Sequence, residues 1–180
     1  MKIGSERLSK ARLLYGQVFH QSNTDKKMDK VNKIVELAKK ECEAHGAVVT
    51  TKRVNVLSIL LLSKKAVSAY ELVDLYEQMF CKPIPVITVY RVLDFLQSKN
   101  LAHKLETANK FVVCTHVDCS HEHPVSQFLI CKKCLKVKEL SMSKPNFVQL
   151  KHTIEQAGFH LKSPQLEMNC ICKACYASAK

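Results

Sequence analysis

The sequence predicts an α+β protein built in two parts, and three patterns along its 180 residues lead to this class. Apolar residues recur at helical spacing up to Ser98, an alternating hairpin pattern follows, and the remainder mixes strand-like runs with two Cys-x-x-Cys pairs. With 47% hydrophobic and 24% charged residues, the chain can bury a core, which excludes wholesale disorder. No apolar run approaches the ~20 residues that a membrane-spanning helix needs, and the first 21 residues lack the features of a secretory signal. A cytoplasmic protein is therefore expected.

The chain begins with a segment that lacks sustained periodicity. Residues 1–27 are expected to form a loosely ordered N-terminal arm. From Met28 to His45 the apolar residues fall on one helical face, and Gly46 provides a stop. A second apolar helix is expected over residues 52–63.

Two further helices complete the helical part. Ser68 and Glu71 form a capping box, in which the serine hydroxyl accepts from the backbone amide of the glutamate and the carboxylate reaches back. The third helix therefore starts at Ser68. A fourth helix follows over residues 86–98 and is closed by Asn100, a residue type that tolerates the left-handed conformation.

A β-hairpin is expected after the helices. Apolar and polar residues alternate over 101–105, a polar turn follows, and residues 111–114 return as a strand. Helices followed by a hairpin are the order of a winged helix-turn-helix, so residues 28–113 are predicted to form such a domain.

The second part is predicted to be a small α/β unit at residues 128–180, joined to the first by a hinge and loop at 114–127. Strands are expected on both sides of the first Cys-x-x-Cys pair, at 128–130 and 137–140. A helix over 143–157 and a strand over 161–171, leading into the second pair, complete the unit.

The two Cys-x-x-Cys pairs favour a structural zinc site made by Cys131, Cys134, Cys172 and Cys175. Each turn places two sulfurs on one side of a tight loop, and two such turns brought together by antiparallel strands supply a tetrahedral thiolate set. A redox-active or incidental pair is the alternative, and it is weaker when two pairs occur in one small unit. Cys170 is interpreted as a spare buried thiol on the opposite strand face.

A second, mixed group of ligands is scattered along the chain: His103, Cys114, His121, His123 and Glu139. Two imidazoles, one thiolate and one carboxylate make a credible zinc site that should bind less tightly than four thiolates. His116 and Cys119 compete as ligands in the same loop, and spacing alone does not separate them.

An anionic partner is indicated by 28 Lys and Arg against 16 acidic residues, a formal net charge of +12. The candidate DNA reader is the fourth helix, which carries Thr88, Tyr90 and Arg91, because arginine can donate two hydrogen bonds to guanine. Tyr70 could add a contact. An ordinary helix that packs its aromatic side chains is the alternative. Candidates for phosphate contacts are Lys52, Arg53, Lys64, Lys65, Lys104 and Lys110.

These motifs together resemble the ferric uptake regulator (Fur) family over residues 29–176, in family order. Within the family, the chain looks like the zinc uptake regulator (Zur) branch, because of its Ser-Ala-Tyr-Glu motif and the cysteine that ends the hairpin. The resemblance is carried by Ser68-Ala-Tyr-Glu-Leu-Val-Asp74, Thr88-Val-Tyr-Arg-Val-Leu-Asp-Phe-Leu96, His103-Lys104, Phe111-Val-Val-Cys114, Phe128-Leu-Ile-Cys-Lys-Lys-Cys134 with Glu139, and Gly158-Phe159 before the last cysteine pair.

The resemblance implies a winged-helix DNA-binding domain followed by a zinc-stapled dimerisation domain. It further implies a cytoplasmic, homodimeric, zinc-responsive repressor of zinc-uptake genes, with two zinc ions per subunit and a palindromic double-stranded DNA operator. Tyr70 and Arg91 match family positions associated with base contact.

The ligands also follow from the resemblance. The four paired cysteines match the family's structural zinc ligands, and His103, Cys114 and Glu139 match its regulatory site. The family's fourth regulatory ligand falls where this chain has Pro124, so His123 is the nearest choice and His121 the reserve.

Two other classes of protein compete with a zinc-responsive regulator. A zinc hydrolase or thiol oxidoreductase needs an open coordination position and a general base, whereas one candidate site is all-thiolate. A family relative that responds to iron, manganese or peroxide is the other alternative, and Cys114 argues against it because a soft thiolate favours zinc. A regulator that is not an enzyme and has no small-molecule substrate is therefore expected.

Overall fold

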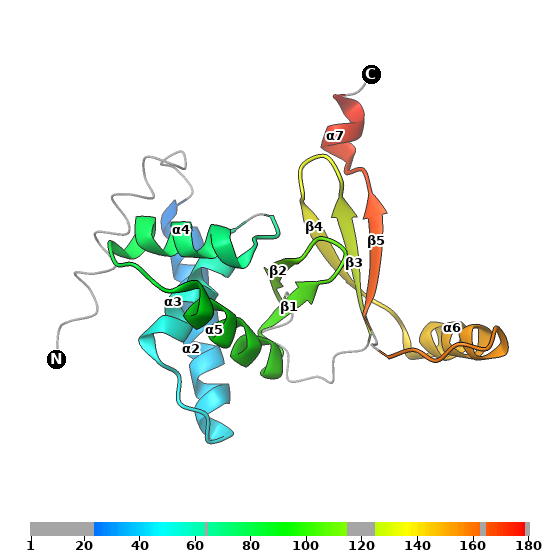
Figure 1. Cartoon of the computed structure of the whole chain (residues 1–180), viewed down its shortest axis with the longest axis horizontal. Coiled ribbons are helices and arrows are strands. Elements are labelled where there is room, and N and C mark those ends of the chain that lie inside the picture. Colours follow the sequence, from blue (N-terminus) through cyan, green and yellow to red (C-terminus); the bar gives the residue numbers. More distant parts are fainter. Residues whose placement is uncertain (1–23, 64, 115–124, 163–164, 179–180) are drawn as a thin grey trace. The chain divides into compact units, whose positions relative to one another are not determined.

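The computed structural model describes residues 24–63, 65–114, 125–162 and 165–178. They divide into two compact units, one holding the first helices and the hairpin and the other holding the cysteine pairs, and helices and small sheets confirm the predicted α+β class (Figure 1). The predicted arm up to residue 23 and the loop with His121 and His123 lie outside the described residues. Among the described residues, no helix has the length and apolar character needed to cross a membrane.

Four helices form the body of the first unit: α2 (Thr24–Ala44), α3 (Thr51–Leu62), α4 (Ala69–Phe80) and α5 (Val86–Ser98). Their apolar faces meet in one core, where Val56, Ile59, Leu72, Val89 and Leu93 are each 0% exposed. The helix positions agree with the apolar periodicity, except that α2 begins four residues earlier than Met28.

The helix ends follow the local sequence. Gly46 (φ +68°) follows α2 and Asn100 (φ +54°) follows α5, both in the left-handed region that glycine and asparagine tolerate. The capping box predicted at Ser68 and Glu71 is present at the start of α4. These features confirm the predicted ends of α2 and α5 and the predicted start of α4.

The hairpin consists of β1 (Ala102–Leu105) and β2 (Lys110–Val113), paired antiparallel with His103 opposite Val112. Val67, just before α4, adds a two-bond bridge to Phe111: the Val67 amide donates at 3.0 Å and the Phe111 amide at 2.7 Å. The hairpin is therefore attached to the segment that leads into α4.

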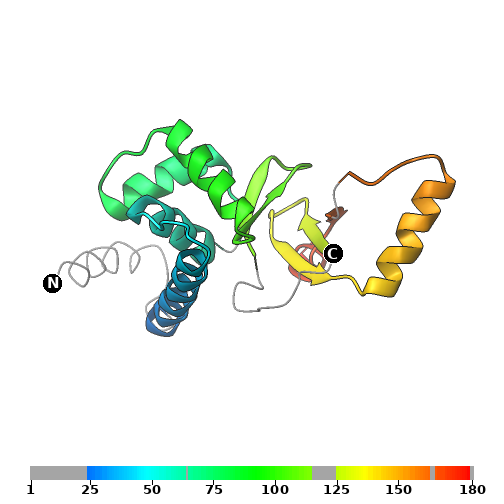
Figure 2. The same ribbon diagram turned by 90° about the horizontal axis from the view of Figure 1, so that it is seen from below.

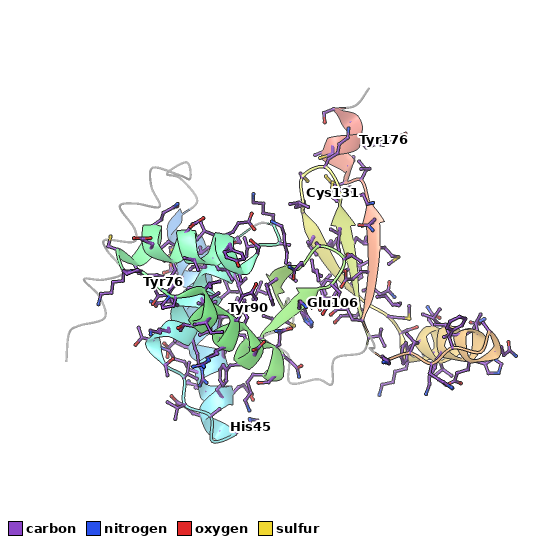
Figure 3. The ribbon with its side chains drawn as sticks, viewed as in Figure 1. His45, Tyr76, Tyr90, Glu106, Cys131 and Tyr176 are labelled. Atoms are coloured by element: carbon purple, nitrogen blue, oxygen red, sulfur yellow. The ribbon has the colours of Figure 1, made fainter. Side chains whose placement is uncertain are left out.

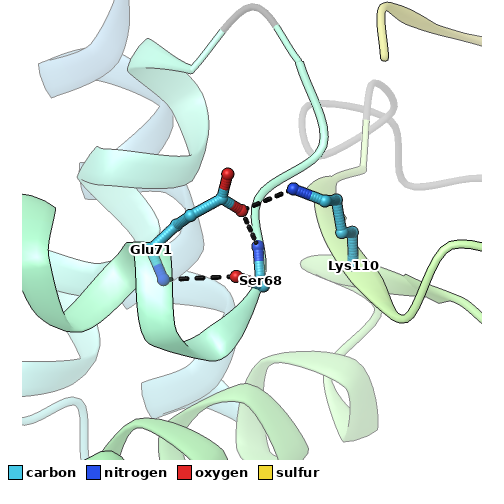
Figure 4. A network of polar contacts seen from close by, with 3 residues as sticks. All are labelled: Ser68, Glu71 and Lys110. Carbon is cyan, nitrogen blue, oxygen red and sulfur yellow. Dashed lines mark hydrogen bonds and ion pairs between the residues drawn. The ribbon is translucent and has the colours of Figure 1, made fainter.

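A polar network reinforces this attachment (Figure 4). The Lys110 ammonium donates to Oε2 of Glu71 at 2.6 Å, and the Ser68 amide donates to the same oxygen at 2.6 Å. The Glu71 amide donates in turn to the Ser68 hydroxyl at 3.2 Å. One carboxylate thus fixes both the first turn of α4 and the start of β2.

The second unit is built on a three-stranded sheet in the order β4-β3-β5: β3 (Ser126–Cys131), β4 (Val137–Ser141) and β5 (Leu166–Cys170). β3 and β4 are antiparallel, whereas β3 and β5 are parallel. The expectation that antiparallel strands bring the two cysteine pairs together is therefore wrong. Because the long connection from β4 runs through a helix, β5 enters the sheet in the same direction as β3.

That connection carries α6 (Lys144–Gln156), which ends before Gly158 (φ +83°). Figures 1 and 2 show α6 standing clear of the three strands of its unit. No residue of α6 is buried, and even the apolar side chain of Val148 is 64% exposed. A short helix, α7 (Lys173–Ala177), spans part of the second cysteine pair and was not predicted.

Candidate metal centre and nucleic-acid interface

The four paired cysteines come together at one end of the second unit's sheet. Cys131 is the last residue of β3, and the parallel register sets it beside Cys170, the last residue of β5. The segment after β3 turns to bring in Cys134, and the segment after β5 brings in Cys172 and Cys175. The sulfurs of Cys131, Cys134, Cys172 and Cys175 all lie within 4.8 Å of one another. Figure 3 marks Cys131 at this end of the sheet.

The dimensions of this cluster fit a tetrahedral zinc ion. Zinc–sulfur bonds of about 2.3 Å in a tetrahedron separate neighbouring sulfurs by about 3.8 Å. The sulfurs of Cys134 and Cys172 lie 3.7 Å apart, close to that edge and far longer than a disulfide bond of about 2.05 Å. The Cys172 amide also donates to the Cys131 sulfur at 3.4 Å, a contact that supports a negatively charged thiolate.

The pKa values of the cluster show how strongly its sulfurs interact. Backbone hydrogen bonds, first from Cys172 and then from Cys134, lower the pKa of Cys131 to about 6. Hydrogen bonds to Cys134 and then Cys172 raise the pKa of Cys175 to about 12. Without a cation Cys131 and Cys175 therefore favour different protonation states, whereas a divalent cation stabilises the ionised form of all its thiolate ligands.

Cys170 lies outside the four-sulfur cluster. It is half-buried rather than buried, and its register position beside Cys131 differs from the opposite face predicted for it. In a parallel pair, residues that are register partners share a face of the sheet. The first interpretation of Cys170 as a fully buried spare thiol is corrected accordingly.

Two of the proposed regulatory ligands meet within the first unit. A ring nitrogen of His103, on β1, lies within 4.8 Å of the sulfur of Cys114, which follows β2. The hairpin explains this proximity, because the Cys114 amide donates to the Leu101 carbonyl at 3.0 Å and continues the ladder. Cys114 is only 2% exposed, so its sulfur faces the protein rather than bulk solvent.

Glu139 is positioned by the second unit. It lies on β4 opposite Phe128, and its carboxylate accepts a hydrogen bond of 2.9 Å from the Ser126 hydroxyl. A carboxylate fixed in this way presents a defined oxygen to a ligand. His121 and His123, the candidates for a fourth ligand, lie outside the described residues.

The helix predicted to read DNA exposes only some of the residues chosen for it. Arg91 is exposed on α5, and Tyr70, the second residue of α4, is 67% exposed. Thr88 and Tyr90 are half-buried, and the Tyr90 ring packs against the helical core (Figure 3). Tyr90 therefore contributes to packing within its unit.

The basic residues differ in whether their side chains are exposed or engaged in contacts within the unit. Lys52 is exposed, whereas the Arg53 guanidinium stacks 3.4 Å from the centre of the Phe95 ring and donates to the Val48 carbonyl. Arg53 therefore ties the start of α3 to α5.

Two lysines considered for phosphate contacts are engaged in ion pairs. Lys110 pairs with Glu71, and Lys104 pairs with Glu106 at 2.8 Å. The Glu71–Lys110 pair spans 39 positions, so no local pattern could have revealed it.

One exposed residue of α5 was missed in the sequence. Ile87, in the first turn of α5, is 59% exposed although Val89, Val92, Leu93 and Leu96 on the same helix are buried. The break in helical apolar periodicity at Ile87 was a signal available in the sequence.

The comparisons with known proteins agree with this architecture. The model of the ferric uptake regulator family matches residues 44–169. The zinc uptake regulation protein of Escherichia coli (strain K12) is 34% identical over 139 residues, covering 77% of this chain and 78% of the relative.

Solved structures extend the likeness to three dimensions. A zinc uptake regulator complexed with zinc and DNA is similar with a TM-score of 0.71 and 28% identity, over 83% of this chain and 97% of that one. Holo XcZur is similar with a TM-score of 0.67 and 36% identity, over 81% of this chain and 99% of that one. The resemblance first found in the motifs is thus confirmed, and the chain belongs to the ferric uptake regulator family.

Proposed function

We propose that this protein is a zinc-responsive transcriptional repressor of zinc-uptake genes. The observation that carries the proposal is its similarity, over more than three quarters of its length, to proteins named as zinc uptake regulators, one of them solved with zinc and DNA. The chain's own residues support it with a four-sulfur cluster that fits zinc and a helical unit with an exposed arginine on its last helix.

The four-sulfur cluster serves as the structural zinc site. Cys131 and Cys134 close the end of β3, and Cys172 and Cys175 follow β5, so the cluster joins the two parallel strands at their carboxyl ends. Because four thiolates fill a tetrahedral site, they leave no open position for a substrate, and this favours a structural role over hydrolysis.

The second zinc site is regulatory and gives a total of two zinc ions per subunit. Its proposed ligands are His103, Cys114, Glu139 and His123, with His121 in reserve. His103 and Cys114 belong to the first unit and Glu139 to the second. A site of this composition is complete only when both units adopt one arrangement, so metal binding favours that arrangement by differential affinity.

Zinc is the metal that this ligand set favours. The bound ion would supply a centre that accepts nitrogen, sulfur and oxygen ligands together in tetrahedral geometry. The thiolate of Cys114 argues against iron, manganese or peroxide sensing, since a soft sulfur ligand selects zinc over hard ions.

A homodimer is supported by the exposed apolar surface of the second unit. Val148 on α6 and Met168 on β5 are 64% and 40% exposed, and Phe159, Ile171 and Tyr176 are 70%, 44% and 63% exposed. A contiguous patch of exposed apolar residues marks an association surface, and we propose that these five residues contribute to one in the dimer. A two-fold dimer binds a palindromic operator whose half-sites lie about 34–36 Å apart.

DNA reading is assigned to the helical unit. Tyr70 and Arg91 are the proposed base-reading residues because both are exposed. Lys52, on α3, contacts a phosphate. Arg53 lies next to it, and Thr88 and Tyr90 lie on α5 with Arg91. These three residues contribute to the DNA interface in part by holding the helices in position. The net charge of +12 adds attraction to the phosphate backbone. A DNA-bound repressor of this kind works in the cytoplasm, has no small-molecule substrate and is not an enzyme.

A zinc titration of DNA binding, with metal content counted, tests the proposal. Protein carrying one tightly held zinc per chain should bind its operator weakly, and addition of about one further zinc per chain should restore tight binding. Cys114→Ser should keep the first zinc and lose the response. DNA binding restored by Mn²⁺ or Fe²⁺ but not by trace zinc would contradict the choice of metal.

A further inference from the structure

The exposed side chain of Ile87 is a feature of the described part of the helical unit that the proposed function leaves unused. Ile87 is 59% exposed in the first turn of α5. Four other apolar residues of this helix are buried: Val89, Val92, Leu93 and Leu96. Exposure of a β-branched aliphatic side chain to water is unfavourable, so a partner outside the unit would stabilise it.

The position of Ile87 relative to Arg91 indicates that partner. The two residues are four positions apart on one helix, so they project from the same face, and both are exposed. The N-terminal residues of a recognition helix are the ones that contact base edges in the major groove. Ile87 precedes Arg91 and lies nearer to that N-terminus.

The major groove offers one apolar group to such a side chain, the C5 methyl of thymine. We propose that Ile87 is a specificity-determining residue that packs against a thymine methyl in each half-site. This inference rests on the proposed function and adds to it an apolar contact beside the base contact proposed for Arg91.

The helix geometry also fixes the spacing of the two contacts. Four residues of α-helix span about 6 Å, and successive base pairs lie about 3.4 Å apart. If Arg91 reads a guanine, the thymine contacted by Ile87 lies about two base pairs from it. The half-site should therefore hold a thymine and a guanine at that interval.

Deoxyuridine substitution tests the contact directly, because it removes only the methyl group. The probe is a duplex selected from a random-sequence library by the zinc-loaded full-length protein, in which each thymine is replaced in turn by deoxyuridine. For the wild type, replacement at one thymine per half-site should weaken binding about fourfold, the value of one buried methyl-sized group. Replacement in both half-sites should weaken binding about fifteenfold.

The variant Ile87→Ala should bind the thymine duplex more weakly and should no longer distinguish thymine from deoxyuridine at that position. Ile87→Val, which retains two methyl groups, should preserve part of the discrimination. Leu37→Ala, which truncates an exposed aliphatic residue on α2, is the matched control and should behave as the wild type. Thermal unfolding of each variant confirms that the fold is intact.

The outcomes separate this inference from the proposed function. If a duplex is selected and bound in a zinc-dependent manner, yet Ile87→Ala discriminates deoxyuridine as the wild type does, the Ile87 contact is wrong and the proposed function stands. If the zinc-loaded protein selects no duplex, the proposed function is contradicted and the contact is overturned with it.

Discussion

At the scale of single residues, Glu71 illustrates how one side chain can join two elements. Burial acts to raise the pKa of its carboxyl, but the hydrogen bonds from Lys110 and Ser68 outweigh burial and lower the pKa to about 2. The ionised form is therefore favoured in the folded state. Its stabilisation is fully present above the unfolded pKa near 4.5 and is lost as the pH falls from there towards 2.

This pH dependence predicts the behaviour of Glu71→Gln. The variant should lose about 1 kcal/mol of unfolding free energy at pH 7, the size of a cap with a partly exposed ion pair. The difference from wild type should be smaller at pH 4, where the unfolded state binds a proton that the folded state does not. Urea unfolding at both pH values measures this difference.

Glu106→Gln is the matched control for that experiment. Glu106 also pairs with a hairpin lysine, but its side chain is 70% exposed and it caps no helix. Its loss should stay below about 0.5 kcal/mol at either pH. Equal losses in the two variants, or a Glu71 effect that does not change with pH, would contradict the assigned role.

At the scale of elements, zinc at the four-sulfur cluster would hold together two strands that no tight turn connects. β3 and β5 are parallel neighbours in the sheet, but β4 and α6 lie between them in the sequence. A metal that binds both ends compensates for the entropy lost in closing this long connection. The second unit is therefore expected to depend on the cluster more than the helical unit does.

Substitution of one cluster cysteine should expose that dependence. Cys131→Ser should lose the tightly held zinc and abolish slow amide exchange in β3 and β5, while the helices α3 to α5 keep theirs. Cys170→Ser, in the neighbouring strand position but outside the four-sulfur cluster, should keep both. Hydrogen exchange and zinc content give the comparison, and a Cys170→Ser variant as damaged as Cys131→Ser would argue against the assigned ligand set.

The helix α6 provides a second prediction at this scale. Val148 is exposed on a helix that buries no residue within its own unit, and we expect a second copy of the chain to cover it. Val148→Asp should shift the protein from dimer to monomer in sedimentation experiments, because an unpaired charge in an apolar interface is unfavourable. Gln149→Asp introduces the same charge at the adjacent exposed position and should remain dimeric. A dimeric Val148→Asp protein would exclude α6 from the interface.

Local features of the fold were predictable from the sequence, and features set by distant residues were not. The capping box at Ser68, the stop at Gly46 and the left-handed Asn100 depend on neighbouring residues, so their residue types identified them. The parallel entry of β5 and the Glu71–Lys110 pair depend on the path of the chain through space. The spacing of residue types along the sequence does not specify that path.

The candidate sites divide in the same way. The four cysteines were found because two short motifs of fixed spacing need only be brought together. The proximity of His103 to Cys114 follows from the antiparallel hairpin, which the alternating pattern predicted. The exposure of Arg91 and the engagement of Arg53 with Phe95 required the packed helices, since both residues are simply basic in the sequence.

At the scale of the whole molecule, we propose that the helical unit reads DNA and that the cysteine-rich unit forms the dimer. The link between metal and DNA is the proposed regulatory site, whose ligands are divided between the two units. In the proposed mechanism, zinc binding favours one arrangement of the helices that read DNA, and loss of zinc removes that preference. Regulation by zinc depends on this division of ligands.

A crystal structure of the zinc-loaded protein, with anomalous diffraction recorded at the zinc edge, tests that division most directly. The account predicts two anomalous peaks per chain: one among Cys131, Cys134, Cys172 and Cys175, and one bound by His103, Cys114, Glu139 and a histidine of the 114–127 segment. A single peak at the four cysteines, with His103 and Cys114 turned to solvent and distant from Glu139, would contradict the account.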